Sequence, residues 1–385
     1  MVKKLRIAVI TSWFPKDQAD FSGIFIREQV EVLGERFQID VVHPEIDYSV
    51  FRPFFSKRIS EFEIKGIPVI RIQVRQSFPI FNQWNFLVAT KHYIVNRLKD
   101  QKIDLIHCHV SYPAGVLGML VANRLGVPFV ITEHYGDFVG LFRTPIHKYL
   151  ILRAMSKAAG ISTVSQYSRR IIQRFTNTPI TVVPNVIDVS KFSLIKNKKP
   201  EKREIMAGFL GGLDTDVKGL DILLRAVAEL PRLPLVIKIG GDGKLLGHYK
   251  GLARQLGLAE KCIFMGKIPV DRRFEFFNSL DFFILSSRHE SFGVVLLEAM
   301  ASGLPVVATR CGGPEEIVDK ENGILVEKEN PPALAKGLQI MIKQYALFDP
   351  LKIRTRVARY FGKEAFLTRM EKFYLGVLQG REKNG

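Results

Sequence analysis

The chain has 385 residues, of which 47% are hydrophobic and 24% charged, with 30 Gly and 19 Pro. This composition is typical of a globular protein and excludes a disordered or fibrous chain, and the length favours two domains. The net charge of +18 favours anionic partners. The sequence contains no zinc-finger, basic-zipper or RNA-binding motif, so we do not expect nucleic acid to be the partner.

The termini and the cysteines give no sign of export. Arg124 interrupts the longest apolar stretch, so we expect no membrane-spanning helix. Two lysines precede a short apolar run at the N-terminus, but a signal peptide needs a longer run and a cleavage site. Cys108, Cys262 and Cys311 lie far apart within apolar segments. We therefore expect reduced thiols and a cytoplasmic protein.

Short β-branched runs alternate with helical patterns along the chain. The predicted strands are RIAVI, QIDVV, VIRIQV, DLIHC, PFVIT, GISTV and ITVV in the first half, and IMAGFLG, LVIKIGG, CIFMG, FFILSS, PVVAT and GILV in the second. Strands that alternate with helices indicate βαβ units and parallel sheets. The expected fold class is α/β, with two doubly wound, Rossmann-like domains facing a central cleft, where ligands bind at the carboxyl ends of the strands.

The domain boundaries follow from composition. Residues 193–204, SLIKNKKPEKRE, are polar, rich in Lys and contain Pro200, so they are predicted to form a linker. This linker separates an N-terminal domain, residues 1–192, from a C-terminal domain, residues 205–350. Residues 351–385 are predicted to form a basic helical tail.

The stretch DFFILSSRHESFGVVLLEAMASGLP combines a strand, a turn and a helix with two carboxylates. Glu290 lies in the turn, Ser291 is the predicted N-cap, and Glu298 lies in the helix that Gly303 ends. The amides at a helix start favour an anion, and the two acids flank that position. A nucleotide-sugar, with hydroxyls at both ends and phosphates between, has this form. The alternative is that Glu290 caps the turn and Glu298 is solvated.

The longer stretch ESFGVVLLEAMASGLPVVATRCGGPEEIV resembles the E-x7-E region of the family 4 retaining glycosyltransferases, which have the GT-B architecture. TEHYGD, VVPNVID, GLDTDVKGLDILLRA, GGDG and CIFMGKIP resemble further segments of this family in the same order. The resemblance implies a retaining hexosyltransferase. Such an enzyme moves a sugar from a nucleoside diphosphate sugar donor to a hydroxyl of a glycan or lipid-linked acceptor.

The same resemblance implies roles for individual residues. Glu290 would contact the donor hexose, Glu298 the ribose hydroxyls and Lys218 the diphosphate. His134 would lie near the reacting carbon, so His134, Lys218 and Glu290 are the expected catalytic residues. The expected donor-binding residues are Gly23, Gly211, Gly212, Lys218, Gly266, Lys267, Ile268, Glu290, Ser291, Phe292, Gly293, Val294 and Glu298.

The sequence departs from the family pattern at three places. Gly212 stands where the family usually has an Arg, six positions before the Lys. The family's Asn-Gly-Val-Asp is replaced by residues 185–188, Asn-Val-Ile-Asp, and its Gly-Gly after the first strand is reduced to Ser22-Gly23. The first departure removes a cation from the diphosphate site. A non-catalytic sugar-nucleotide or membrane-binding module of the same fold is therefore the alternative function.

We expect no cofactor and no metal beside the nucleotide-sugar co-substrate. Asp214 and Asp216 imitate the metal-binding Asp-x-Asp of a different glycosyltransferase fold, but they lie beside Lys218 in a loop of another pattern. Solvated carboxylates are the preferred interpretation, and metal binding is the alternative. For His107 and His109, at one strand end, neutral hydrogen-bonded rings are preferred over metal ligands.

Aromatic and basic residues are intermixed in three segments of the first domain, VFRPFFSKRIS, RQSFPIFNQWNF and DFVGLFRTPIHKYL. Such segments suit an acceptor groove or a membrane interface, and interior packing is the alternative. Together with the charge, they lead us to expect peripheral association with an anionic membrane surface at the inner face of the membrane.

Overall fold

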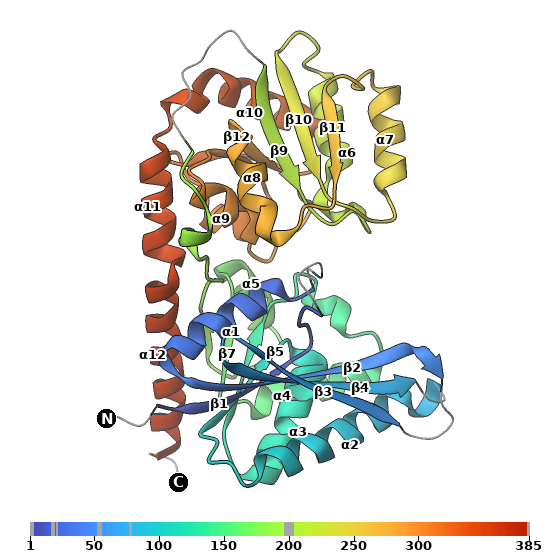
Figure 1. The fold of residues 1–385 in the computed structure, drawn as a ribbon, viewed down its shortest axis with the longest axis vertical. Coiled ribbons are helices and arrows are strands. Elements are labelled where there is room, and N and C mark those ends of the chain that lie inside the picture. The colour runs from blue at the N-terminus through green and yellow to red at the C-terminus, as the bar shows by residue number, and fades with distance from the viewer. Residues whose placement is uncertain are drawn as a thin grey trace. The chain divides into compact units, whose positions relative to one another are not determined.

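The computed structural model describes residues 4–16, 20, 22–51, 56–76, 79–195 and 204–382. The chain divides into two compact units, one formed by Met1–Pro184 with Phe366–Gly385 and the other by Asn185–Ala365. Each unit contains a sheet flanked by helices (Figure 1). The predicted α/β class with two Rossmann-like domains is therefore confirmed.

The first unit is built on a sheet that has eight strands among the described residues, in the order β3-β4-β2-β1-β5-β6-β7-β8. The described neighbours are parallel, except that β3 and β4 are antiparallel. The strands are β1 (Arg6–Thr11), β2 (Gln38–Phe51), β3 (Lys57–Ile64), β4 (Ile67–Gln76), β5 (Leu105–His109), β6 (Phe129–Glu133), β7 (Gly160–Thr163) and β8 (Ile180–Val182). The helices of this unit are α1 (Ile24–Arg36), α2 (Pro79–Leu98), α3 (Val116–Leu125), α4 (Pro145–Lys157), α5 (Gln166–Ile172) and the greater part of α12 (Lys363–Glu382).

Strand β3 is the element of this sheet that the sequence did not predict. Its sequence, KRISEFEI, alternates charged with apolar residues, and most of its side chains are exposed or half-buried. Lys65 and Gly66, both at positive φ, make the tight turn into β4. The prediction relied on continuous apolar runs, which identify strands buried on both faces and miss an amphipathic strand at a sheet edge.

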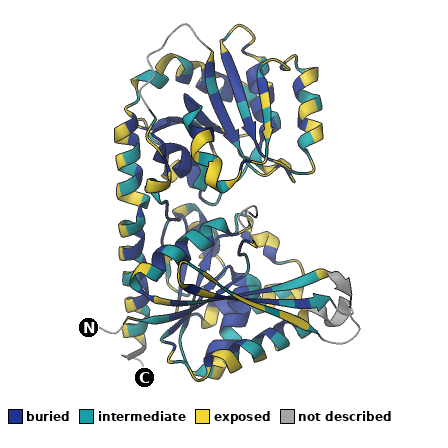
Figure 2. Ribbon diagram, viewed as in Figure 1, coloured by how far each residue is buried: buried dark blue, intermediate teal, exposed yellow. Residues whose placement is uncertain are grey.

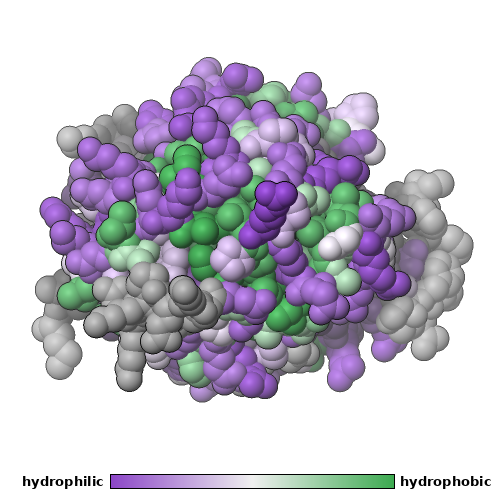
Figure 3. All heavy atoms as spheres, turned by 90° about the horizontal axis from the view of Figure 1, so that it is seen from above, coloured by the Kyte–Doolittle hydropathy of each residue, from purple (hydrophilic) through white to green (hydrophobic). Residues whose placement is uncertain are grey.

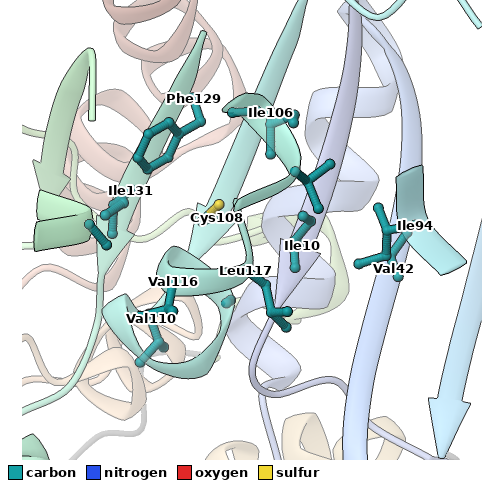
Figure 4. Close-up of a cluster of buried hydrophobic side chains, with 14 of the residues drawn as sticks. Ile10, Val42, Ile94, Ile106, Cys108, Val110, Val116, Leu117, Phe129 and Ile131 are labelled. Atoms are coloured by element: carbon teal, nitrogen blue, oxygen red, sulfur yellow. The ribbon is translucent and has the colours of Figure 1, made fainter. Parts of the chain in front are cut away.

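The core of the first unit lies along the central strands. Ile10 of β1, Ile106 of β5 and Ile131 of β6 are fully buried and belong to one apolar cluster (Figure 4). Cys108 lies in the same cluster, and burial raises the pKa of its thiol. A Cβ at Gly118 of α3 would lie 2.0 Å from the Cys108 sulfur, so only glycine lets α3 pack this closely on β5.

The second unit is built on a parallel sheet with the order β11-β10-β9-β12-β13-β14 in the described part of the chain. Its strands are β9 (Ile205–Leu210), β10 (Leu235–Gly240), β11 (Cys262–Gly266), β12 (Phe282–Leu285), β13 (Val306–Arg310) and β14 (Gly323–Glu327). Its helices are α6 (Leu220–Ala228), α7 (Leu246–Gln255), α8 (Arg273–Asn278), α9 (Val294–Ala301), α10 (Pro331–Gln344) and α11 (Pro350–Phe361). In both units the strands are mostly buried and the exposed residues lie mainly on the helices (Figure 2).

The N-terminal segment of the first unit ends at Pro184, earlier than the predicted boundary at residue 192. The residues that follow bond into the second unit. The amide of Ile187 donates to the carbonyl of Phe361 at 2.9 Å, and Arg354 donates to the carbonyl of Phe192 at 2.6 Å. The boundary therefore depends on partners far along the chain, which the composition of the local segment cannot indicate.

The predicted tail, residues 351–385, is helical but is shared between the units. Helix α11 packs against α9 in the second unit, whereas Phe366 and the residues after it belong to the first. There the Tyr374 hydroxyl lies 2.7 Å from Nδ1 of His107, and Arg36 forms an ion pair of 2.8 Å with Glu371. The C-terminal helix is thus an integral part of the first unit.

Parts of three predicted segments lie outside the described residues. These are most of the linker, residues 193–204, and parts of the two aromatic–basic segments VFRPFFSKRIS and RQSFPIFNQWNF. Within the described ranges, no helix combines the length and the apolar character that a membrane span requires. One face of the molecule mixes hydrophilic side chains with smaller apolar areas (Figure 3), as most protein surfaces do.

Candidate active site

The predicted donor-binding residues of the second unit lie at one edge of its sheet. Strands β11, β10, β9 and β12 are neighbours, and their carboxyl ends meet at this edge. The loops that follow them carry Gly266, Lys267 and Ile268 after β11, Gly211, Gly212 and Lys218 after β9, and Glu290, Ser291, Phe292, Gly293 and Val294 after β12. This is the edge where open parallel sheets bind ligands.

Lys218 and Glu290 form an ion pair at this edge. The Lys218 ammonium lies 2.5 Å from Oε1 of Glu290, which also accepts a hydrogen bond of 2.9 Å from the Ser287 hydroxyl. The Glu290 side chain is 12% exposed and that of Lys218 is 34% exposed. A carboxylate and an ammonium are therefore held together where solvent still reaches the cation.

Arg288 joins the loop that carries Lys218 to the loop that carries Glu290. Its guanidinium makes two hydrogen bonds to Asp221, of 2.9 and 2.8 Å, and its backbone amide donates to the carbonyl of Val217 at 2.8 Å. Burial alone would raise the pKa of Asp221, but hydrogen bonding to Arg288 lowers it below its usual value. The sequence analysis missed this residue, although it lies two positions before Glu290.

Two glycines permit the close backbone contacts on which this arrangement depends. Gly219 has a φ of 63°, and a Cβ there would lie 2.1 Å from the carbonyl oxygen of Ser286. A Cβ on Gly313 would lie 2.2 Å from the Cα of Phe292. Both contacts are too short for any other residue, so these positions fix the Lys218 and Glu290 loops against the sheet.

Helix α9 begins at Val294 with Gly293 as its N-cap, not with Ser291 as predicted. Gly293 has a φ of 102°, a conformation that glycine adopts without strain, and no side chain caps the helix. The first amides of a helix have no partner within the helix. Here the Leu296 amide donates to the carbonyl of Gly293 at 2.9 Å, which leaves the amides of Val294 and Val295 for an anion.

Glu298 of α9 is buried and pairs with Arg273 of α8. Its side chain is 7% exposed, that of Arg273 is 13% exposed, and Oε1 contacts the guanidinium. Oε2 is buried and has no hydrogen-bond partner among the described residues. The sequence analysis gave a solvated Glu298 as the alternative, and nothing in the local pattern identified its partner Arg273, which lies on a different helix.

Gly212, where the family usually has an arginine, has open space beside it. A Cβ placed on Gly212 meets no atom within 4 Å, and its φ lies outside the positive range that disfavours side chains. An arginine could therefore be accommodated there without displacing the backbone.

We expect Gly212→Arg to strengthen binding of UDP or GDP about tenfold, because a charge-assisted hydrogen bond contributes about 1.5–3 kcal/mol. Isothermal titration calorimetry measures the effect. Gly251→Arg is the matched control, since Gly251 on α7 is also open and the substitution adds the same charge. Unchanged affinity in Gly212→Arg would show that the diphosphate does not lie beside position 212.

The predicted site residues of the first unit lie at the carboxyl ends of β1 and β6. Gly23, with a φ of 74°, is the N-cap of α1, and a Cβ there would lie 2.6 Å from the carbonyl oxygen of Trp13. Phe25, two residues later, contacts the ring of His134, with 5.0 Å between the ring centroids. The structure therefore places Gly23 and His134 near each other within this unit.

His134 is part of a cluster of three buried histidines. Its Nε2 lies 2.9 Å from Nδ1 of His109, whose ring is tilted against that of His107 with 4.2 Å between centroids. Burial lowers the pKa of His134 to about 3, and that of His107 to about 3, so both rings are neutral at pH 7. Nδ1 of His134 is buried and has no hydrogen-bond partner among the described residues. A neutral ring with one nitrogen left over suits a hydroxyl ligand.

Neither of the two candidate metal sites, Asp214 with Asp216 or His107 with His109, acquires a third ligand among the described residues. The Asp214 carboxylate accepts a hydrogen bond of 3.3 Å from the Lys244 amide, while Asp216 lies 3.8 Å from the Arg288 guanidinium. Nowhere in the described ranges do three or more His, Cys, Asp or Glu side chains gather in a way that could hold a metal ion.

Comparisons with known proteins agree along the chain. The family model described as "Glycosyltransferase Family 4" matches residues 22–191, and the model described as "Glycosyl transferases group 1" matches residues 190–360. An uncharacterised glycosyltransferase of Methanocaldococcus jannaschii is 30% identical over 268 residues, which are 69% of this chain and 73% of that protein. The D-inositol 3-phosphate glycosyltransferase of Corynebacterium jeikeium is 32% identical over 280 residues, 65% of each chain.

Solved structures share the fold across almost the whole length. Sucrose-phosphate synthase from Thermosynechococcus elongatus is 20% identical with a TM-score of 0.80, over 98% of this chain and 100% of that one. Anabaena HepE in complex with UDP and glucose is 19% identical with a TM-score of 0.74, over 96% and 99%. With the matching segments and the arrangement of the carboxyl-end loops, these findings show that the chain belongs to glycosyltransferase family 4 and has the GT-B fold.

Proposed function

We propose that this glycosyltransferase transfers a hexose, with retention, from a nucleoside diphosphate sugar to a hydroxyl of a glycan or lipid-linked acceptor. The observation that carries the proposal is the ion pair of Lys218 and Glu290 in the loops before α9, the helix that also carries Glu298. A cation and the N-terminus of a helix suit a diphosphate, and the two carboxylates suit the hydroxyls on either side of it.

The buried oxygen of Glu298 supports a ribose in this position. An ionised oxygen that is buried without a donor is costly, because burial removes its hydration. A ribose hydroxyl would supply the missing donor. Likewise, a sugar hydroxyl could bond to Nδ1 of His134, which the neutral ring presents in the first unit.

A front-face reaction fits the chemistry of these side chains. Oε1 of Glu290 already accepts from Lys218 and Ser287, which makes it a poor nucleophile for a double displacement. Instead, the acceptor oxygen forms its bond to the sugar carbon on the face from which the diphosphate departs. The leaving phosphate oxygen takes the acceptor proton. Lys218 and the amides of α9 stabilise the charge that develops on the diphosphate.

Relatives support the substrate classes. Anabaena HepE has been solved with UDP-glucose, and a Mycolicibacterium smegmatis relative, 28% identical, is named a GDP-mannose-dependent phosphatidylinositol monomannoside mannosyltransferase. An alpha-monoglucosyldiacylglycerol synthase of Streptococcus pneumoniae is 28% identical. We therefore include both UDP and GDP donors, and we retain a lipid-linked acceptor at an anionic membrane surface in the proposal.

A screen of UDP- and GDP-hexoses by thermal shift tests the donor. At 100 times the Kd, a ligand stabilises the folded protein by about 2.7 kcal/mol, which raises the melting temperature. We expect one donor to do so and then to release nucleoside diphosphate when acceptor is added, with activity unchanged in EDTA. Activity that EDTA removes and Mn²⁺ restores would instead support Asp214 and Asp216 as metal ligands.

Gly212 favours one alternative, a non-catalytic sugar-nucleotide-binding module, because it removes a cation from the diphosphate site. That function predicts binding of a donor without its turnover by any acceptor. The same screen, followed by measurement of nucleoside diphosphate release, separates the two.

A further inference from the structure

The loop that carries Lys218 runs from the end of β9 to the start of α6 and is rich in glycine. Gly211 and Gly212 open this loop, and Gly219 closes it. Glycine gives the backbone access to many conformations, and the long lysine side chain adds further rotatable bonds. The place that the Lys218 ammonium takes therefore depends on how the rest of the unit holds this loop.

The segment after β12 binds three consecutive carbonyls of the Lys218 loop. The Ser286 hydroxyl donates to the carbonyl of Lys218 at 3.1 Å, and the Arg288 amide donates to the carbonyl of Val217 at 2.8 Å. The Arg288 guanidinium donates through Nη1 to the carbonyl of Asp216 at 2.6 Å. The turn from Asp216 to Lys218 is therefore held at each of its residues by the segment between β12 and α9.

Arg288 is itself fixed by the first turn of α6. Its Nη1 and Nη2 donate to the two carboxylate oxygens of Asp221 at 2.9 and 2.8 Å, which is the geometry of a bidentate pair. Asp221 lies in the first turn of its helix, where the helix dipole also favours a carboxylate. One guanidinium thus joins Asp216, which precedes Lys218, to Asp221, which follows it.

The surroundings of the Arg288 guanidinium favour a positioning role over direct binding of phosphate. Its Nε lies 3.8 Å from the Asp216 carboxylate and 3.7 Å from that of Glu329, in addition to the bidentate pair with Asp221. Hydrogen bonding to Asp221 raises the pKa of Arg288 above its usual value. Carboxylates on several sides compensate the charge of the guanidinium and would repel a phosphate. Arg288 is therefore engaged within the protein, in contact with the loop that carries Lys218.

We propose that Arg288 is a positioning residue, which holds Lys218 in place for the diphosphate by clamping the Lys218 loop to the first turn of α6. The inference rests on the proposed function, which places Lys218 at the diphosphate. A displaced ammonium loses both the distance and the angle that a charge-assisted hydrogen bond requires. Since Gly212 replaces the family arginine, the position of Lys218 matters more in this chain than in relatives that have both cations.

The test measures the binding of UDP, UMP, GDP and GMP to the full chain by calorimetry. The ratio of diphosphate to monophosphate affinity reports the contacts of the additional phosphate, and a general loss of stability would not lower it selectively. Arg288→Met should lower this ratio about tenfold, because the Lys218 loop is released from α6. The control is Arg225→Met, which removes the same charge from an exposed position on α6 and should leave the ratio unchanged.

Two further variants separate positioning from direct binding. In a Lys218→Ala background, Arg288→Met should change the ratio less than about twofold, because Arg288 acts through Lys218; a full additional loss would overturn the inference. Asp221→Asn keeps the size of the side chain and loosens the clamp, so it should lower the ratio even if Arg288→Met does not fold.

The opposite results identify which proposal fails. A higher ratio in Asp221→Asn would show that the released Arg288 binds phosphate itself, and an unchanged ratio in Arg288→Met would show that Lys218 needs no clamp. Either result would overturn the positioning role and leave the proposed function standing. A parent that binds diphosphates no better than monophosphates would contradict the proposed function, and the inference with it.

Discussion

Replacing Lys218 with alanine is expected to lower kcat/KM at least about 100-fold while the protein stays folded. A charge that stabilises a developing anion in an active site is typically associated with a rate effect of about 10²–10³. Gly212 supplies no second cation at the position where the family usually has one. The effect should appear in kcat as well as KM, because the negative charge on the leaving diphosphate grows as the bond breaks.

The control for Lys218→Ala is Lys336→Ala on α10, which removes the same charge from an exposed position in the same unit. Its turnover should match that of the parent. The melting temperature checks that both variants are folded. In Lys218→Ala, Glu290 loses the ammonium but keeps its hydrogen bond from Ser287, so we expect the variant to stay folded. Turnover within threefold of the parent in Lys218→Ala would remove Lys218 from the diphosphate site.

Glu298→Ala is expected to cost both stability and nucleotide binding. It leaves the buried Arg273 guanidinium without its carboxylate, and breaking a buried ion pair in this way typically costs about 3–5 kcal/mol. It also removes the oxygen proposed for the ribose, whose charge-assisted hydrogen bond contributes about 1.5–3 kcal/mol. Urea unfolding and calorimetry with UDP and GDP measure the two losses.

The double variant Arg273→Met/Glu298→Leu separates these effects. Replacing a buried ion pair with apolar side chains of similar volume is often neutral or stabilising, so the free energy of unfolding should return to within about 1 kcal/mol of the parent. Nucleotide binding should remain weak, because the acceptor for the ribose is still missing. If the double variant binds UDP or GDP as tightly as the parent, Glu298 does not contact the ribose.

Local patterns in the sequence were sufficient to predict the α/β class. The central strands of both units are buried on both faces, so they appear as short continuous apolar runs between turn residues and helices. The alternation of strand and helix then restricts the topology to parallel sheets. The grouping of the Lys218 and Glu290 loops was predictable in the same way, because both follow strands whose carboxyl ends share an edge.

Other features depended on residues far apart in the chain, and tertiary structure alone decided them. Arg273, which lies on a different helix from Glu298, pairs with that acid, and Tyr374 of the C-terminal helix reaches His107 in the first unit. Edge strand β3 pairs with β4 through an amphipathic pattern that resembles a solvated segment. Which side chain balances a buried charge, and which unit a helix joins, depends on how the sheets and helices pack. The sequence around any one residue carries no record of that packing.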